Sequence, residues 1–98
     1  MSEPVLSAAD VDEAIAEQQL QWTRQDDQLV TSVKLHDFAA ALKFVNAVGA
    51  AAEAANHHPD IDIRWNTVNL ALTTHDSGGL TVFDLALAGA IDRLRPSR

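Results

Sequence analysis

The sequence predicts an α+β fold in which three helices pack on one face of a single four-stranded antiparallel sheet, in the order α-β-β-α-β-β-α. Three observations lead to this prediction. Two pairs of strand-like segments are each joined by a short turn, as in antiparallel hairpins. Three other segments repeat apolar residues at helical spacing. One sheet with every helix on the same face is the simplest way to bury both patterns.

The first part of the chain is expected to form a helix followed by a hairpin. Ser7 can serve as the N-cap of this helix, and Asp10 occupies the capping-box position three residues later. Residues 20–24 and 29–35 are expected to be strands, with apolar and polar side chains alternating along the second of them. The Asp-Asp-Gln sequence at 26–28 is expected to form the turn between these strands.

A long helix is predicted over residues 38–55. Asp37 is a suitable N-cap, and alanine, which has the highest helix propensity, occurs throughout the segment. Pro59 marks the end, since the residue before a proline is pushed out of the helical region. The expected apolar stripe consists of Phe38, Ala41, Leu42, Val45, Val48, Ala52 and Ala55.

The second hairpin and the last helix complete the predicted order. Residues 61–65 and 68–74 are expected to be strands, because apolar and polar side chains alternate along both. The His-Asp-Ser-Gly-Gly sequence at 75–79 is expected to be a flexible loop. Thr81 then begins the last helix, with Asp84 three residues later as its capping-box acid.

Length, cysteine content and hydropathy limit the class of protein. Ninety-eight residues are expected to form one domain over positions 1–98. The chain has no cysteine, which excludes disulfides, thiol nucleophiles and thiolate metal sites. No stretch is expected to span a membrane, and residues 1–4 lack the basic and apolar regions of a signal peptide. We therefore expect a cytoplasmic protein.

The charge balance argues against nucleic acids and membranes as partners. Fourteen acidic residues against seven basic ones give a net charge of −7. A surface of this kind repels phosphate backbones and anionic lipids. Basic residues gather only at Arg93, Arg95 and Arg98, and such a tail is expected to be solvated.

Three of the four histidines lie at predicted element boundaries. His57 and His58 stand where the long helix breaks, and His75 stands where the fourth strand ends. Imidazole titrates near neutral pH, so these groups can both donate and accept protons. Pro59 limits where the adjacent pair can point, because its ring fixes the chain direction. His36 is expected to be a solvated loop residue.

Each of the other candidate residues also has a purely structural explanation. Asp84 can act only as the capping acid of the last helix, and Glu53 can be an exposed helix residue. Trp22 and Trp65 lie on predicted strands and can belong to the core.

Metal binding and hydrolase chemistry are weaker alternatives. Three histidines with Glu53 or Asp84 have suitable ligand types for zinc or iron. However, neighbouring side chains such as His57 and His58 point apart in an extended segment, and the chain has no helical His pair at i, i+4. A serine hydrolase is also disfavoured, since no serine lies in a nucleophile-elbow context. We expect no metal and no bound cofactor.

The spacing of these residues resembles the signature of the pterin-4a-carbinolamine dehydratase family. Glu53 is followed after three residues by His-His-Pro at 57–59, and after five more by the aromatic Trp65. Nine residues then lead to His75 and eight more to Asp84. Every position of the pattern carries an allowed residue type, and a match at this many positions is far more specific than any one motif in it.

The resemblance implies a hydro-lyase that removes water from 4a-hydroxytetrahydropterin, the spent cofactor of aromatic amino-acid hydroxylases. The product would be the quinonoid dihydropterin. Such a reaction needs a proton delivered to the leaving 4a-hydroxyl and a proton taken from N5. The residues implied are His57, His58 and His75 as catalytic groups, Glu53, Asp84 and Pro59 in support, and Trp22 and Trp65 as pterin-binding residues.

The individual roles remain open at this stage. His57 and His75 are expected to be the acid–base groups, and His58 is expected either to exchange protons or to bind the substrate. Glu53 and Asp84 could each orient an imidazole. The family also implies a homodimer or homotetramer. The competing interpretation is a non-catalytic dimerisation or scaffold protein with a dehydratase-like fold.

Overall fold

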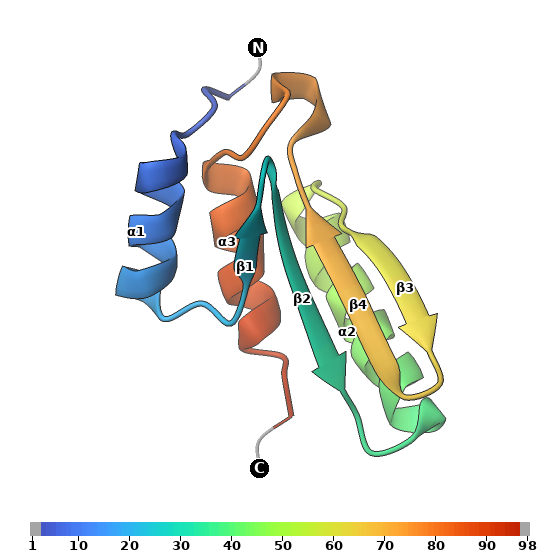
Figure 1. Ribbon diagram of the computed structural model, residues 1–98. Coiled ribbons are helices and arrows are strands. Elements are labelled where there is room, and N and C mark those ends of the chain that lie inside the picture. Colours follow the sequence, from blue (N-terminus) through green and yellow to red (C-terminus); the bar gives the residue numbers. More distant parts are fainter. Residues whose placement is uncertain (1–2, 97–98) are drawn as a thin grey trace.

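The structure, a computed structural model, describes residues 3–96 (Figure 1). The predictions for the amino terminus at 1–4 and for the basic tail ending at Arg98 therefore fall partly outside the described residues. The elements follow the predicted order, with one short 3-10 turn added. They are α1 (Ala8–Gln18), β1 (Thr23–Gln25), β2 (Gln28–Lys34), α2 (Phe38–Ala55), β3 (Asp60–Arg64), β4 (Thr67–Leu72), η1 (His75–Ser77) and α3 (Val82–Asp92).

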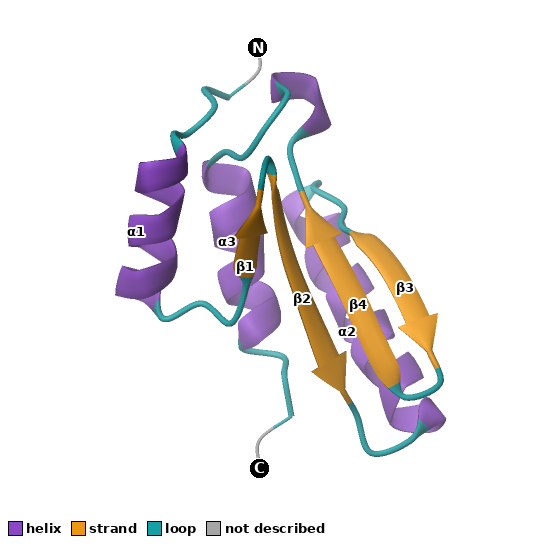
Figure 2. Cartoon of the chain, in the orientation of Figure 1, coloured by secondary structure: helices purple, strands orange, loops and turns teal. Residues whose placement is uncertain are grey.

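The four strands form one antiparallel sheet in the order β1-β2-β4-β3. Each hairpin therefore supplies one central strand and one edge strand. The central pair has Leu29 opposite Leu72 and Val33 opposite Val68. Figure 2 shows α2 and α3 on the same side of the sheet, with α1 beside α3. The predicted α+β architecture is confirmed.

The two faces of the sheet differ in chemistry because side chains alternate along the strands. Leu29 and Val68 are completely buried on the face that the helices cover. The opposite face is open and polar: Ser32 donates to Asn69 at 2.5 Å, and the Asn69 amide donates to Asp62 at 2.9 Å. The hydrogen bond from Asn69 holds the pKa of Asp62 below its usual value.

The first strand is shorter than the predicted segment 20–24, because the backbone polar groups of Gln21 bond elsewhere. β1 begins at Thr23. The Gln21 N–H donates to the Asp92 carboxylate at 2.8 Å, and the Gln21 carbonyl accepts from Arg95 at 3.0 Å. These partners, at and just beyond the end of α3, replace the bonds that a longer strand would make with β2.

Helix α2 has the predicted bounds, and Ala41, Val48 and Ala52 of the predicted stripe are buried. Phe38 and Leu42 belonged to the predicted stripe, yet they are 44% and 41% exposed. Apolar residues occupy most sides of this alanine-rich helix, so periodicity alone does not fix the edges of its buried side. The residues that are buried are Ala41, Phe44, Val48 and Ala52.

Helix α2 also contradicts the expectation that no stretch could span a membrane. Its 18 residues have a mean hydropathy of 1.3, which is sufficient by length and composition alone. Half of those residues are alanine, so the hydropathy comes largely from small side chains. In the fold the helix packs against β4 and α3, as the core helix of a globular domain does.

The predicted strand 61–65 ends one residue early. Trp65 and Asn66 form the two-residue turn between β3 and β4. Trp65 has φ of 55°, a left-handed conformation that is uncommon for a bulky side chain. The alternation of apolar residues along β3 continued into the turn, which is why the sequence placed Trp65 on the strand.

Candidate active site

The end of α2 directs the two adjacent histidines toward different elements. Asn56 ends the helix in the left-handed conformation, which asparagine tolerates better than most residues. Its N–H bonds to the Glu53 carbonyl, and the His57 N–H bonds to the Ala52 carbonyl at 3.1 Å, which together form a Schellman motif. The chain therefore leaves the helix along a fixed path, and His57 and His58 meet different partners.

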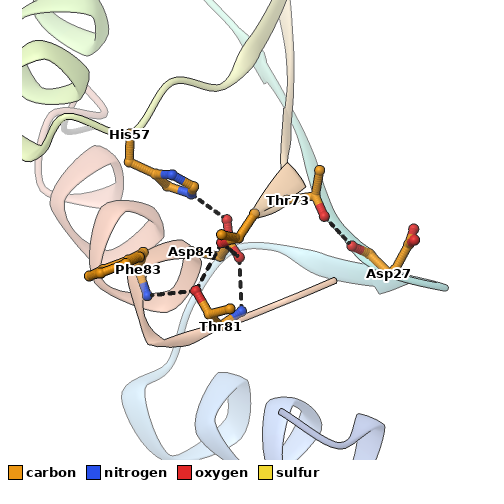
Figure 3. A network of polar contacts seen from close by, with 7 residues as sticks. Asp27, His57, Thr73, Thr81, Phe83 and Asp84 are labelled. Carbon is orange, nitrogen blue, oxygen red and sulfur yellow. Dashed lines mark hydrogen bonds and ion pairs between the residues drawn. The ribbon is translucent and has the colours of Figure 1, made fainter. Parts of the chain in front are cut away.

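His57 is held by a buried carboxylate of α3 (Figure 3). Its Nε2 atom lies 2.5 Å from Oδ1 of Asp84, and the two side chains are 13% and 0% exposed. The Phe83 ring lies beside the imidazole, with the ring centroids 6.1 Å apart. Because Nε2 is bonded to Asp84, Nδ1 is the ring nitrogen left for a substrate.

Asp84 also caps the helix that carries it. Its Oδ2 atom accepts the Thr81 backbone N–H at 2.9 Å and the Thr74 hydroxyl at 2.7 Å. The Thr81 hydroxyl in turn accepts the Phe83 N–H at 3.2 Å, so the predicted capping box is confirmed. A helix N-terminus favours negative charge, and this carboxylate therefore has both a structural role and a position beside His57.

His58 forms a second, more exposed histidine–carboxylate pair. Its Nε2 atom lies 2.5 Å from Oε2 of Glu53 on the last turn of α2, and the side chains are 55% and 79% exposed. The adjacent histidines thus bond to separate carboxylates. Among residues 3–96, no three His, Asp or Glu side chains come together as a group that could hold a metal ion.

The segment 75–79, predicted to be a flexible loop, forms a closed turn. The Thr74 carbonyl accepts the N–H groups of Ser77 and Gly78 at 3.0 and 2.9 Å. Thr74 also forms an antiparallel β-bridge with Gly79, which closes the turn. His75 is the first residue of the resulting 3-10 turn η1. These backbone bonds hold His75 at the end of β4.

A shallow pocket of about 220 Å³ brings the three predicted catalytic histidines together. Three imidazoles at one opening can exchange protons with a ligand there. Pro59, which follows the histidine pair, is half-buried at the start of the path to β3. The residues that line the pocket are Asn56, His57, His58, Thr73, Thr74, His75 and Asp76.

The two tryptophans lie away from this pocket. Trp22 is 5% exposed, and its indole N–H donates to Asp92 at 2.9 Å at the opposite end of α3. Trp65 is 69% exposed, at the far end of β3, about 17 Å along the strand from Asp60. Neither side chain lines the pocket. Their role in pterin binding stays a prediction, and a ring as buried as Trp22 offers little surface for stacking.

Two residues beside His57 and Asp84 were not identified from the sequence. Phe83 contacts the imidazole, and Thr74 bonds to the carboxylate. A signal for Thr74 was present, because it continues the buried face of the strand after Leu72. A polar side chain on a buried stripe needs a hydrogen-bond partner, which is a reason to examine it.

Comparison with known proteins gives a consistent picture. The family model described as pterin 4 alpha carbinolamine dehydratase matches residues 4–94. A Chloroflexus aurantiacus protein named "Putative pterin-4-alpha-carbinolamine dehydratase" is 53% identical over 91 residues, which cover 93% of this chain and 97% of the relative. A protein of the same name from Chloroflexus aggregans is 51% identical over 90 residues, which cover 91% and 95%.

Two solved structures share the fold. A transcriptional coactivator/pterin dehydratase from Brucella melitensis superposes with a TM-score of 0.87 at 26% identity, over 94% of this chain and 99% of that one. A pterin dehydratase-like protein described as a RuBisCO assembly factor in the alpha-carboxysome gives a TM-score of 0.64 at 22% identity, over 81% and 92%. At that identity the second likeness concerns the fold alone.

Proposed function

The chain belongs to the pterin 4 alpha carbinolamine dehydratase family, and from this we propose that it is a hydro-lyase acting on 4a-hydroxytetrahydropterin. The products are water and the quinonoid dihydropterin, which a reductase can return to the aromatic amino-acid hydroxylases. The reaction moves two protons and no electrons between substrate and protein. The protein therefore has to supply one acid, for the 4a-hydroxyl, and one base, for N5. The reaction needs no bound cofactor.

In the proposed reaction, His57 is the base and His75 is the acid. His57 accepts the N5 proton through Nδ1 while His75 delivers a proton to the 4a-hydroxyl. The C4a–O bond breaks, water leaves, and the electron pair of the N5–H bond forms the C4a–N5 double bond. His58, paired with Glu53, exchanges protons with solvent and restores the starting states of the other two rings.

The observation that supports this proposal best is the pairing of His57 with the fully buried Asp84 beside a pocket that His58 and His75 share. A carboxylate bonded to one ring nitrogen fixes the tautomer. It also stabilises the imidazolium that forms when the other nitrogen accepts a proton. This supports His57 as the base and leaves His75, which lines the same pocket, as the acid.

The test is a dehydration assay on 4a-hydroxytetrahydropterin generated in place by an aromatic amino-acid hydroxylase. We expect His57→Ala and His75→Ala each to lower the catalysed rate about 10²–10⁴-fold. His36→Ala is the matched control, since His36 is exposed and lies outside the pocket, and its rate should equal that of the wild type. Full rates in both pocket variants would refute the mechanism. Loss of activity in EDTA with recovery in zinc would favour a metal site instead.

The proposal includes assembly and location. We expect residues 1–98 to act as one domain in a cytoplasmic homodimer or homotetramer that binds neither nucleic acid nor membrane. The pocket of about 220 Å³ is smaller than the roughly 300–1,000 Å³ of most small-molecule sites, as a site completed by a second copy would be. Phe38, Leu42 and Ile61 are 40–44% exposed, so apolar surface is available for such contacts. Sedimentation over a range of concentrations tests the assembly.

The competing function is a non-catalytic scaffold. The same exposed apolar side chains would suit a protein partner. In that case the purified chain would not accelerate dehydration, and surface substitutions such as Leu42→Asp would abolish partner capture while the histidine substitutions would not.

A further inference from the structure

A threonine hydroxyl completes the buried carboxylate that holds His57. The Thr74 Oγ1 atom donates to Oδ2 of Asp84 at 2.7 Å and lies 2.8 Å from the hydroxyl oxygen of Thr81. Thr74 is 8% exposed, and both Thr81 and Asp84 are 0% exposed. Little solvent reaches these groups, so each depends on the others for most of its hydrogen bonding.

The direction of every bond in this cluster follows from the ionised carboxylate. Asp84 can only accept, so Thr74 must use its one hydroxyl hydrogen toward Oδ2. The Thr81 hydroxyl must then donate to Thr74, while it accepts the backbone N–H of Phe83. Oδ1 remains for the Nε2–H of His57. Both hydroxyl hydrogens therefore point in the same direction through the cluster, toward the Asp84 carboxylate and the His57 imidazole beyond it.

Thr74 also holds the backbone that carries the second predicted catalytic histidine. Its carbonyl accepts the N–H groups of Ser77 and Gly78, and its own N–H donates to the Gly79 carbonyl at 3.1 Å. These bonds close the turn that begins at His75, the next residue in the chain. One residue thus connects the carboxylate behind His57 with the backbone that carries His75.

We propose that Thr74 is a positioning residue for dehydration: its hydroxyl fixes Asp84 so that His57 keeps its proton on Nε2 and presents Nδ1 to the substrate. This inference rests on the proposed function of the chain. Without the hydroxyl, Oδ2 of Asp84 would keep only the Thr81 N–H as donor. The carboxylate could then rotate away from His57, and neutral His57 would populate both tautomers. Only one of these has a basic Nδ1.

The test compares Thr74→Val, which is nearly isosteric but lacks the hydroxyl, with Thr74→Ser, which keeps it. We expect Thr74→Val to lower kcat about 10–100-fold with little change in KM, and Thr74→Ser to recover most of the loss. Long-range ¹⁵N–¹H spectra of the imidazoles should show the Nε2–H tautomer of His57 in the wild type and in Thr74→Ser. In Thr74→Val they should show a mixture. If Thr74→Val does not fold, Thr74→Ala removes the same hydroxyl without placing a methyl group against the carboxylate.

Thr31→Val is the matched control. The Thr31 hydroxyl bonds to the Gln21 carbonyl at 2.7 Å, in the cluster at the other end of α3. This substitution should leave kcat, its pH profile and the His57 tautomer unchanged in the folded protein. A general effect of losing a threonine hydroxyl would appear in both variants, whereas a positioning effect appears only at Thr74.

Wild-type kcat and an unchanged His57 tautomer in Thr74→Val would overturn this inference while the proposed function stood. A wild-type chain without dehydration activity would overturn the proposed function and the catalytic half of the inference. The tautomer comparison would still show whether Thr74 controls His57. A loss of kcat with the tautomer unchanged, or with no recovery in Thr74→Ser, would also count against it, since the hydroxyl would not be the cause.

Discussion

Both ends of α3 carry an aspartate that receives three hydrogen bonds, and the comparison between them distinguishes a candidate catalytic cluster from a structural one. Asp84 lies at the N-terminal end and Asp92 at the C-terminal end, about 12 Å apart along the helix axis. Each connects α3 to a side chain from a distant part of the sequence. The clusters differ in the chemistry of the donors.

The donors at Asp92 keep their protons at neutral pH. They are the Trp22 indole, the Arg95 guanidinium and the Gln21 backbone N–H, at 2.8–2.9 Å. This C-terminal cluster fastens the segment between α1 and β1 to α3. In the N-terminal cluster one donor is the imidazole of His57, a ring with two nitrogens that can each donate or accept, at the edge of a pocket. Equal numbers of hydrogen bonds therefore do not imply equal roles.

The helix dipole explains why only one of the two aspartates has an arginine beside it. The N-terminal end of a helix favours negative charge, and the C-terminal end opposes it. Asp92 sits at the unfavourable end and forms an ion pair with Arg95, with both side chains only 11–12% exposed. Asp84 sits at the favourable end, and its partners among residues 3–96 are His57, Thr74 and the Thr81 backbone rather than an arginine or lysine. A permanent cation there would compete with His57 for the carboxylate.

The largest expected effect is that of Asp84→Asn. The new amide would donate to Nε2 of His57, so the ring proton would move to Nδ1 and the base would face away from the substrate. We expect the dehydration rate to fall about 10²–10⁴-fold. Steady-state rates of folded protein, checked by circular dichroism, measure it. Activity within a factor of about three of the wild type would show that the two clusters do not differ in the proposed way.

Asp92→Asn should have the opposite profile. It removes the charge from a nearly buried ion pair and turns one acceptor oxygen into a donor that faces other donors. We expect a loss of about 2–3 kcal/mol in the free energy of unfolding, measured by urea denaturation, with kcat of the folded protein unchanged. A loss of kcat without a loss of stability would reverse the assignment of the two clusters.

Trp22→Phe is a smaller perturbation of the C-terminal cluster than Asp92→Asn. It removes one N–H donor from Asp92 and leaves most of the ring volume in the core. We expect a loss of about 1 kcal/mol in the free energy of unfolding, with KM for the pterin unchanged. A rise in KM of about tenfold, with stability preserved, would instead establish the predicted pterin-binding role of Trp22.

The smallest effect is expected at Asp62, an exposed carboxylate on the open face of the sheet. It serves as a reference for the more buried Asp84 and Asp92. Asn69→Ala should raise the pKa of Asp62 toward its usual value, because the hydrogen bond that lowers it is lost. Since the folded-state pKa is lowered, the contribution of Asp62 to stability exists above its unfolded pKa and disappears as pH falls through the folded value. NMR titration of the wild type and the variant measures the shift, and equal pKa values would show that the bond has no influence.

Local signals in the sequence predicted those parts of the fold that local chemistry decides. The bounds of α2 were predicted from the Asp37 cap and from Pro59, and the structure ends the helix at Ala55 with Asn56 as its cap. The capping box at Thr81 and Asp84 was also identified from spacing alone. The family resemblance, which rested on the spacing of Glu53, the His-His-Pro segment, Trp65, His75 and Asp84, is confirmed by the match over residues 4–94.

Predictions that depended on tertiary contacts were less successful. Trp22 was assigned to a strand because nothing near it in sequence reveals Asp92, seventy residues later. The predicted stripe of α2 included the buried Ala41, Val48 and Ala52, but the burial of Phe44 and the exposure of Phe38 and Leu42 depended on where the sheet lies. At the site, spacing indicated that His57 and Asp84 belong together, but the supporting Thr74 becomes visible only when the strand, the turn and the helix meet.

The contrast between the two tryptophans has a practical consequence for spectroscopy. The chain contains no tyrosine, so its near-ultraviolet emission comes almost entirely from Trp22 and Trp65. The buried, hydrogen-bonded indole of Trp22 should emit at shorter wavelength than the 69% exposed Trp65. A Trp65→Phe protein would therefore carry a single intrinsic fluorophore at the C-terminal end of α3. Its emission would change when the contacts at that end of α3 are lost. The histidine pocket could be studied separately.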